Sequence, residues 1–69
     1  MKKIKIKVNG KVKSISKDYK MSDLVKNLKI PIKKVAIELN HEIIDIKRLS
    51  VKILKKNDKI EIVHFIGGG

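Results

Sequence analysis

The last three residues of the chain, Gly67, Gly68 and Gly69, are the residues best suited to chemistry, because they present a terminal carboxylate on a tail without side chains. Glycines cost conformational entropy on folding and add no packing, so the fold gains nothing from them. Fully extended, three residues reach at most about 10 Å, far enough to carry the carboxylate into a narrow slot that any side chain would block. We therefore expect Gly67 and Gly68 to thread into a partner protein and Gly69 to react there.

The Gly69 carboxylate needs activation before it can react, since it is ionised at neutral pH and is then a poor electrophile. A mixed anhydride with AMP would supply a leaving group, and a sulfur nucleophile that displaces AMP would leave a thiocarboxylate on Gly69. The chain contains no cysteine, which excludes a catalytic thiol, a thiolate zinc site and a persulfide on a side chain. A thiocarboxylate stores sulfur without any of these.

The residues just before the tail are apolar on both faces of a predicted strand. Val63, Phe65 and Ile66 run into the glycines without a polar spacer, and we expect these three to form part of a docking surface for a partner. Two other interpretations stay open at this point. The apolar residues would also suit a strand end buried on both sides, and the glycines would also suit a flexible end or the remnant of an expression linker.

The two histidines form no recognisable catalytic or metal site. His41 lies in a predicted turn and His64 in a predicted strand, and neither has a Ser or Cys partner at a known spacing. No glycine-rich loop precedes a helix, so a phosphate-binding loop is not expected either. We expect a protein that is not an enzyme itself, binds no metal and no cofactor, and is acted on by partner enzymes.

Length and composition indicate one small cytoplasmic domain. The 69 residues are rich in Ile, Val and Leu, which pack well on a sheet, and no apolar run approaches the roughly 20 residues that span a bilayer. The net charge of +11 would suit a nucleic-acid partner. However, the lysines alternate with apolar residues as on a solvated strand face, and stacking aromatics are scarce. We expect no nucleic-acid or membrane partner, and a monomer when the chain is free.

The N-terminal part of the chain predicts a β-hairpin. Residues 3–8 alternate Ile or Val with Lys, the period of two that is typical of a half-buried strand. Asn9 and Gly10 then tolerate the positive φ angles of a type I′ turn, and residues 11–16 return as the second strand.

The next segment predicts one short helix. Ser22 is the expected N-cap, and Asp23 complements the helix dipole. The apolar face of this helix is formed by Leu24, Val25 and Leu28. Pro31 ends it, because the residue before a proline is pushed out of the helical region, which leaves about two turns.

The remaining elements complete a small sheet. Residues 35–39 and 42–44 predict a second hairpin around the turn at Asn40 and His41. Residues 45–54 fit neither period, so we expect an irregular stretch with one short helical turn there. The last strand covers residues 59–66.

This order of elements predicts an α+β fold in which one main helix packs across a small mixed β-sheet, with the first and last strands side by side. It is the plan of the ubiquitin-like β-grasp fold. We expect the β-grasp domain at residues 1–66 and a flexible glycine tail at residues 67–69.

Residues 56–69, KNDKIEIVHFIGGG, closely resemble the C-terminal signature of the ThiS family, the sulfur carriers of thiamine biosynthesis. The first turn, the helix and the third strand resemble the family as well, so the resemblance covers essentially the whole chain. It implies a β-grasp fold and adenylation of Gly69 by a ThiF-type enzyme that uses ATP. It further implies conversion to a thiocarboxylate, with sulfur from a donor such as a cysteine desulfurase, and delivery of that sulfur to a ThiG-type thiazole synthase.

Two features depart from the family pattern, and three alternatives stay open. Asn57 stands where the family usually has glycine, and the lysine bias is not a family trait. A molybdopterin-synthase small-subunit-like carrier would share fold and tail, but we expect it to be longer and to have a proline near the tail. A ubiquitin-like modifier would also use Gly69 and would form isopeptide-linked adducts. A basic nucleic-acid module would bind with a steep salt dependence even without the tail.

Overall fold

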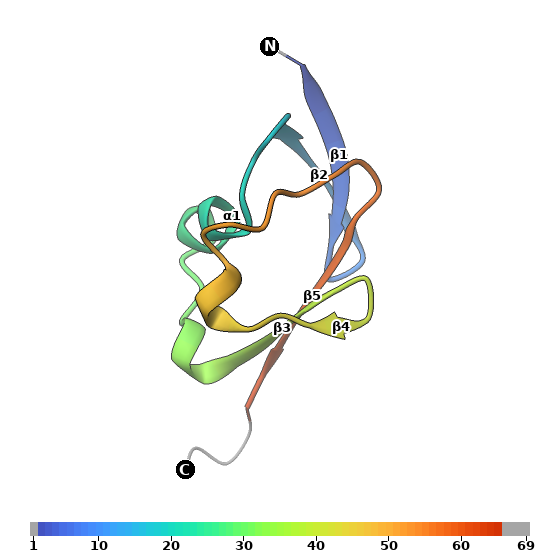
Figure 1. Ribbon diagram of the computed structural model, residues 1–69. Helices are drawn as coiled ribbons and strands as arrows, with labels where there is room; N and C mark the ends of the chain where they lie inside the picture. Colours follow the sequence, from blue (N-terminus) through green and yellow to red (C-terminus); the bar gives the residue numbers. More distant parts are fainter. Residues whose placement is uncertain (1, 66–69) are drawn as a thin grey trace.

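The computed structural model describes residues 2–65, so that Met1 and residues 66–69 lie outside the described part. The elements follow the expected order (Figure 1). They are β1 (Lys3–Val8), β2 (Lys11–Ser16), α1 (Met21–Asn27), the 3-10 turn η1 (Ile32–Lys34), β3 (Val35–Leu39), β4 (Glu42–Ile43), the 3-10 turn η2 (Ile46–Arg48) and β5 (Lys59–His64). The predicted tail and the last residue of the predicted final strand, Ile66, fall outside this description.

The strands form one mixed sheet in the order β2-β1-β5-β3-β4. β1 and β5 lie side by side and parallel, whereas β1–β2, β3–β5 and β3–β4 are antiparallel pairs. The short helix α1 lies across one face of the sheet (Figure 1). The predicted β-grasp arrangement, with its mixed sheet and single main helix, is therefore confirmed.

The turn between β1 and β2 has the geometry expected of an Asn-Gly hairpin. Asn9 and Gly10 have φ angles of 51° and 82°, the pair of positive values that defines a type I′ turn. The side chain of Asn9 has a second role, because its Oδ1 accepts a hydrogen bond of 2.8 Å from the N–H of Ile62. Asn9 thereby adds one hydrogen bond between the hairpin and β5 beyond the end of β1.

The helix begins earlier than expected, so the prediction of Ser22 as the N-cap is wrong. Lys20 is the N-cap, and its backbone N–H donates a hydrogen bond of 3.0 Å to the carboxylate of Asp23. Ser22 lies inside the first turn, where its N–H donates to the C=O of Leu49 at 2.9 Å. The irregular segment after β4 therefore supplies the acceptor for one of the free N–H groups at the start of α1, a role that a capping side chain usually has.

α1 spans about two turns and ends before Pro31, as expected, and it does so at a left-handed residue. Lys29 has a φ of 54°, and the N–H groups of Lys29 and Ile30 donate to the carbonyls of Lys26 and Val25 at 3.2 and 3.0 Å. This is the Schellman arrangement, in which a left-handed residue, usually glycine, closes the helix. Within residues 2–65, no helix has the length and apolar character that crossing a membrane requires.

The second hairpin matches its prediction closely. Asn40 and His41 have φ angles of 51° and 72°, so this turn is also of type I′. β4 ends at Ile43, one residue earlier than expected. The N–H of Ile44 nevertheless donates to the C=O of Ile37 at 2.9 Å, which keeps the strand direction.

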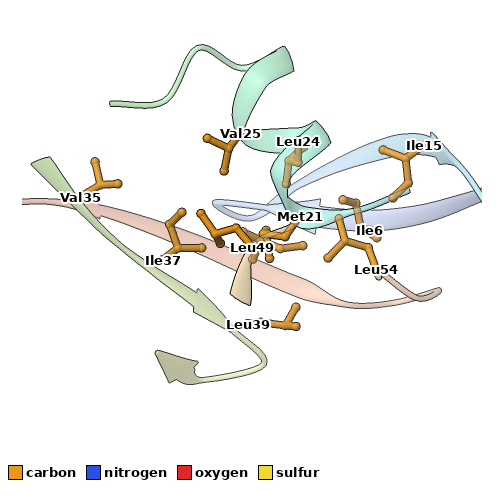
Figure 2. Packing of buried hydrophobic residues seen from close by; sticks show 11 residues of the cluster. Ile6, Ile15, Met21, Leu24, Val25, Val35, Ile37, Leu39, Leu49 and Leu54 are labelled. Carbon is orange, nitrogen blue, oxygen red and sulfur yellow. The ribbon is translucent and has the colours of Figure 1, made fainter. Parts of the chain in front are cut away.

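The hydrophobic core lies between α1 and the sheet (Figure 2). Its buried side chains are Ile6, Ile15, Met21, Leu24, Val25, Val35, Ile37, Leu39, Leu49, Leu54 and Ile60. Leu49 and Leu54 belong to the segment between β4 and β5, whose hydrophobic pattern follows no regular period, yet they are only 5% and 1% exposed. The expected short helical turn in this segment is present as η2.

Candidate functional site

β5 carries the chain towards its C-terminus through the middle of the sheet, between β1 and β3 (Figure 1). The strand ends at His64, and Phe65 is still attached to the sheet because its N–H donates to the C=O of Lys34 at 3.0 Å. Backbone hydrogen bonds thus hold the chain up to the residue before Ile66. The predicted reactive tail, residues 67–69, lies outside the described residues.

The face of the sheet opposite α1 exposes the apolar side chains of the end of β5. Val63 is 49% and Phe65 is 63% exposed, whereas Ile60 and Ile62, on the alternate positions, face the core. This exposure excludes the interpretation that the strand end is buried on both sides. Docking by Val63 and Phe65 stays a prediction, and the third predicted docking residue, Ile66, lies outside the described part.

The strands beside β5 add further side chains to this face, of which Glu38 is half-buried. Glu38 of β3 lies opposite Glu61 of β5, and Ile43 of β4 lies opposite Glu38 on its other side. Ile43 is 73% exposed. We refer to Glu38, Ile43, Glu61, Val63 and Phe65 together as the outer patch. The sequence pattern did not identify Glu38, Ile43 or Glu61, because only the register of the strands places them beside Val63.

The face opposite α1 is divided by charge. The exposed lysines of β1 make one half basic, and Lys7 lies opposite Lys59 at the start of β5. The other half contains Glu38 opposite Glu61, although the chain has only 7 acidic residues against 18 basic ones. Like charges directly opposite one another destabilise a sheet, by up to about 1 kcal/mol. The outer patch is thus an acidic and apolar area on a basic protein.

Neither histidine belongs to a reactive cluster. His41 is a turn residue of the β3–β4 hairpin. His64 lines a groove of about 490 Å³ on the α1 side, together with Leu28, Ile30 and Ile62, and the tip of the β1–β2 hairpin forms the other wall. The described residues that line this groove include no carboxylate, thiol or hydroxyl. Across residues 2–65, no group of three or more His, Cys, Asp or Glu side chains is placed to hold a metal ion.

Similarity to known proteins extends over nearly the whole chain. The sulfur carrier protein ThiS of Bacillus subtilis is 40% identical over 65 residues, which are 93% of this chain and 98% of that protein. A crystal structure of the thiamine biosynthesis protein ThiS from Geobacter metallireducens has a TM-score of 0.83 and 28% identity, and covers 96% of this chain and 100% of its own.

Two longer relatives are thiazole synthases. Those of Magnetococcus marinus and Paramagnetospirillum magneticum are 33% and 35% identical over 66 residues. These residues are 96% of this chain but only 20% of each synthase, so this chain spans about a fifth of their length. The model of the ThiS family matches residues 6–69, which include the three glycines. The chain therefore belongs to the ThiS family, and the resemblance seen in its sequence is confirmed.

Proposed function

We propose that this chain is a sulfur carrier for thiazole formation in thiamine biosynthesis, with the carboxylate of Gly69 as the carrier group. The observation that carries the proposal is the match to the ThiS family, which runs through the C-terminal glycines. The 40% identity to a ThiS protein at nearly full length supports the same use of the tail. It favours this pathway over molybdopterin synthesis.

The proposed reaction takes place on the tail and needs partner enzymes. In a ThiF-type adenylating enzyme, an oxygen of the Gly69 carboxylate attacks the α-phosphorus of ATP, and pyrophosphate leaves. A persulfide on a donor such as a cysteine desulfurase then displaces AMP from the acyl carbon, and thiols such as free cysteine cleave the sulfur–sulfur bond of the acyl disulfide, which releases the thiocarboxylate and leaves a disulfide. One carboxylate oxygen departs with AMP, and sulfur takes its place as a thiocarboxylate.

The folded domain supplies a fixed origin for the tail rather than a reactive group. The N–H of Phe65 is hydrogen-bonded to Lys34, the residue directly before β3, so a partner that binds the sheet also positions the start of the tail. Three extended glycines span at most about 10 Å, which sets the distance between the docked domain and the partner's active site. Val63 and Phe65 are the apolar anchors that such an interface needs.

A ThiG-type thiazole synthase is the acceptor that the relatives support best. In two thiazole synthases, a region similar to this chain makes up 20% of the protein. That region and the rest of the synthase therefore share one polypeptide there. Covalent linkage holds two regions at a high effective concentration, which is useful if one acts on the other. We propose that the present chain meets a thiazole synthase as a separate protein.

Intact mass spectrometry tests the carrier chemistry. The full chain is incubated with ATP, a ThiF-type adenylating enzyme, a cysteine desulfurase and cysteine, and its mass should rise by the difference between sulfur and oxygen. A variant without Gly69 is the control: it should fold like the full chain, because the tail adds no packing, and should show no gain. An unchanged mass of the full chain, with an adenylating enzyme that is active on another carrier, would refute the proposal. Isopeptide-linked adducts would then indicate a ubiquitin-like modifier.

A further inference from the structure

β5 has an open edge near its C-terminal end. Phe65 belongs to the set of alternate residues whose backbone groups face β3, since its N–H donates to Lys34 at 3.0 Å. In an antiparallel pair, the residues that alternate with this set point their N–H and C=O groups away from the partner strand. Ile62 and His64 therefore direct these groups to the opposite edge of β5, on the side of β1.

β1 is too short to cover this edge. Its pairing with β5 ends with Val8 opposite Ile60. Asn9 then makes two more hydrogen bonds, from its N–H to the C=O of Ile60 at 2.9 Å and from the N–H of Ile62 to its Oδ1 at 2.8 Å. Beyond them, β1 has no residue paired with Ile62 or His64. Within residues 2–65, no hydrogen bond from a turn, a loop or a side chain reaches the C=O of Ile62 or the N–H of His64 either. Such unpaired edge groups are a template for an additional strand.

The groove on the α1 side lies beside this open edge. Its apolar part includes Leu28 and Ile30, which follow the end of α1, and its polar part includes Lys11, Lys13 and His64. None of the described residues that line it is acidic. A strand that paired with β5 would direct every second side chain towards this groove. An apolar side chain there would contact Leu28 and Ile30, and an acidic one would meet the lysines.

We propose that an extended segment of the thiazole synthase, with apolar and acidic side chains, pairs with the open edge of β5 as an added strand. The C=O of Ile62 and the N–H of His64, which are open within residues 2–65, match the donor and the acceptor of an added strand, and the groove determines which side chains suit it. The exposed side chains of Val63 and Phe65 belong to the same end of β5, so one partner can contact both. The identity of this partner rests on the proposed function and on the two thiazole synthases among the relatives.

The substitution His64→Pro tests the added strand. It removes the N–H of residue 64 but no hydrogen bond to β3, and proline is tolerated where a strand's N–H faces outwards. His64→Ala is the matched control, because it removes the imidazole and keeps the N–H. Binding of each full chain, with its ordinary carboxylate, to purified thiazole synthase is measured by calorimetry. We expect His64→Pro to raise the Kd about 10-fold or more, and His64→Ala to change it by less than about 3-fold.

A second pair of variants tests the charge of the bound segment. Lys11→Glu with Lys13→Glu reverses the basic wall of the groove and should raise the Kd for the synthase about 10-fold. Lys47→Glu with Lys55→Glu makes the same change of net charge at exposed positions outside the groove. This control pair should bind as the wild type does, and the comparison stays valid even if His64→Pro lowers the Tm.

Three results would overturn the inference. The first is an unchanged Kd for a folded His64→Pro variant, and the second is an equal loss of binding in both lysine pairs, which would indicate a long-range effect of charge. The third is that the wild-type chain binds no thiazole synthase. The gain of mass on Gly69 does not involve the synthase, so the carrier chemistry and the added strand can fail separately.

Discussion

Asn9 combines two roles that three substitutions can separate. It adopts a φ of 51° in the type I′ turn, and its Oδ1 accepts a hydrogen bond of 2.8 Å from the N–H of Ile62. Asn9→Asp keeps both a tolerance of the left-handed conformation and an acceptor. Asn9→Gly keeps the conformation alone, and Asn9→Ala keeps neither. The series should therefore separate the loss of unfolding free energy caused by the strained turn from the loss caused by the missing hydrogen bond.

The structure sets the expected order of stabilities in this series. One intramolecular hydrogen bond contributes about 1 kcal/mol, and the left-handed conformation costs an ordinary residue about 1 kcal/mol more. Asn9→Asp should thus have a free energy of unfolding close to that of the wild type, Asn9→Gly about 1 kcal/mol less, and Asn9→Ala about 2 kcal/mol less. In a domain of this size 1 kcal/mol shifts the Tm by about 4–8 °C, so thermal unfolding resolves all three.

Amide hydrogen exchange then locates the effect on β5. The N–H of Ile62 should exchange faster in Asn9→Gly than in the wild type, because its acceptor is gone. The N–H of Leu28, which donates to Leu24 at 3.0 Å at the end of α1, is the internal control and should keep its rate relative to global unfolding. Equal protection of Ile62 in Asn9→Gly and in the wild type would refute the role assigned to the side chain.

Four further substitutions test the helix end and the outer patch. Lys29→Gly relieves the left-handed conformation at φ 54° and should raise the free energy of unfolding by about 0.5–1 kcal/mol. Lys26→Gly, inside the last turn of α1, should lower it by about 1 kcal/mol; a loss at both sites in urea denaturation would contradict this account of the Schellman end. Glu61→Lys places opposite charges across the strands at Glu38 and should raise the Tm by a few degrees, about 0.5–1 kcal/mol, whereas a lower Tm would show that the two carboxylates do not repel. Phe65→Ala should weaken binding to the partner enzymes by about 10-fold or more and leave the Tm unchanged, since this side chain is 63% exposed; unaltered affinity in calorimetry would remove it from the docking surface.

Local patterns predicted the parts of the fold whose causes are local. Asn9-Gly10 predicted a type I′ turn and Asn40-His41 predicted a turn, and both turns have positive φ angles at these residues. The start of α1 could not be predicted in this way, because Leu49 supplies an acceptor for one of its first N–H groups from a distant segment. For the same reason, the burial of Leu49 required knowledge of where that segment lies.

The candidate site divides along the same line. The glycine tail can be recognised in the sequence alone, because three consecutive residues without side chains are unusual in themselves. The outer patch is not, because Glu38 and Glu61 meet only through the register of β3 with β5. The alternation of β5 indicated that Val63 and Phe65 share a face, but whether that face was covered depended on which side α1 packed.

The length of the first hairpin determines how much of β5 stays uncovered. β1 and β5 are parallel, and Val8 lies opposite Ile60, so the turn at Asn9 and Gly10 ends β1 while β5 continues past it. A turn two residues later would extend β1 to the position opposite Ile62. The turn itself would then lie alongside His64 and would occupy the edge where we place a strand of the partner. The Asn-Gly signal is plain in the sequence, yet its consequence for the site depends on a parallel register between the two ends of the chain. No local pattern contains that register, and the open edge therefore emerges only when the sheet is assembled.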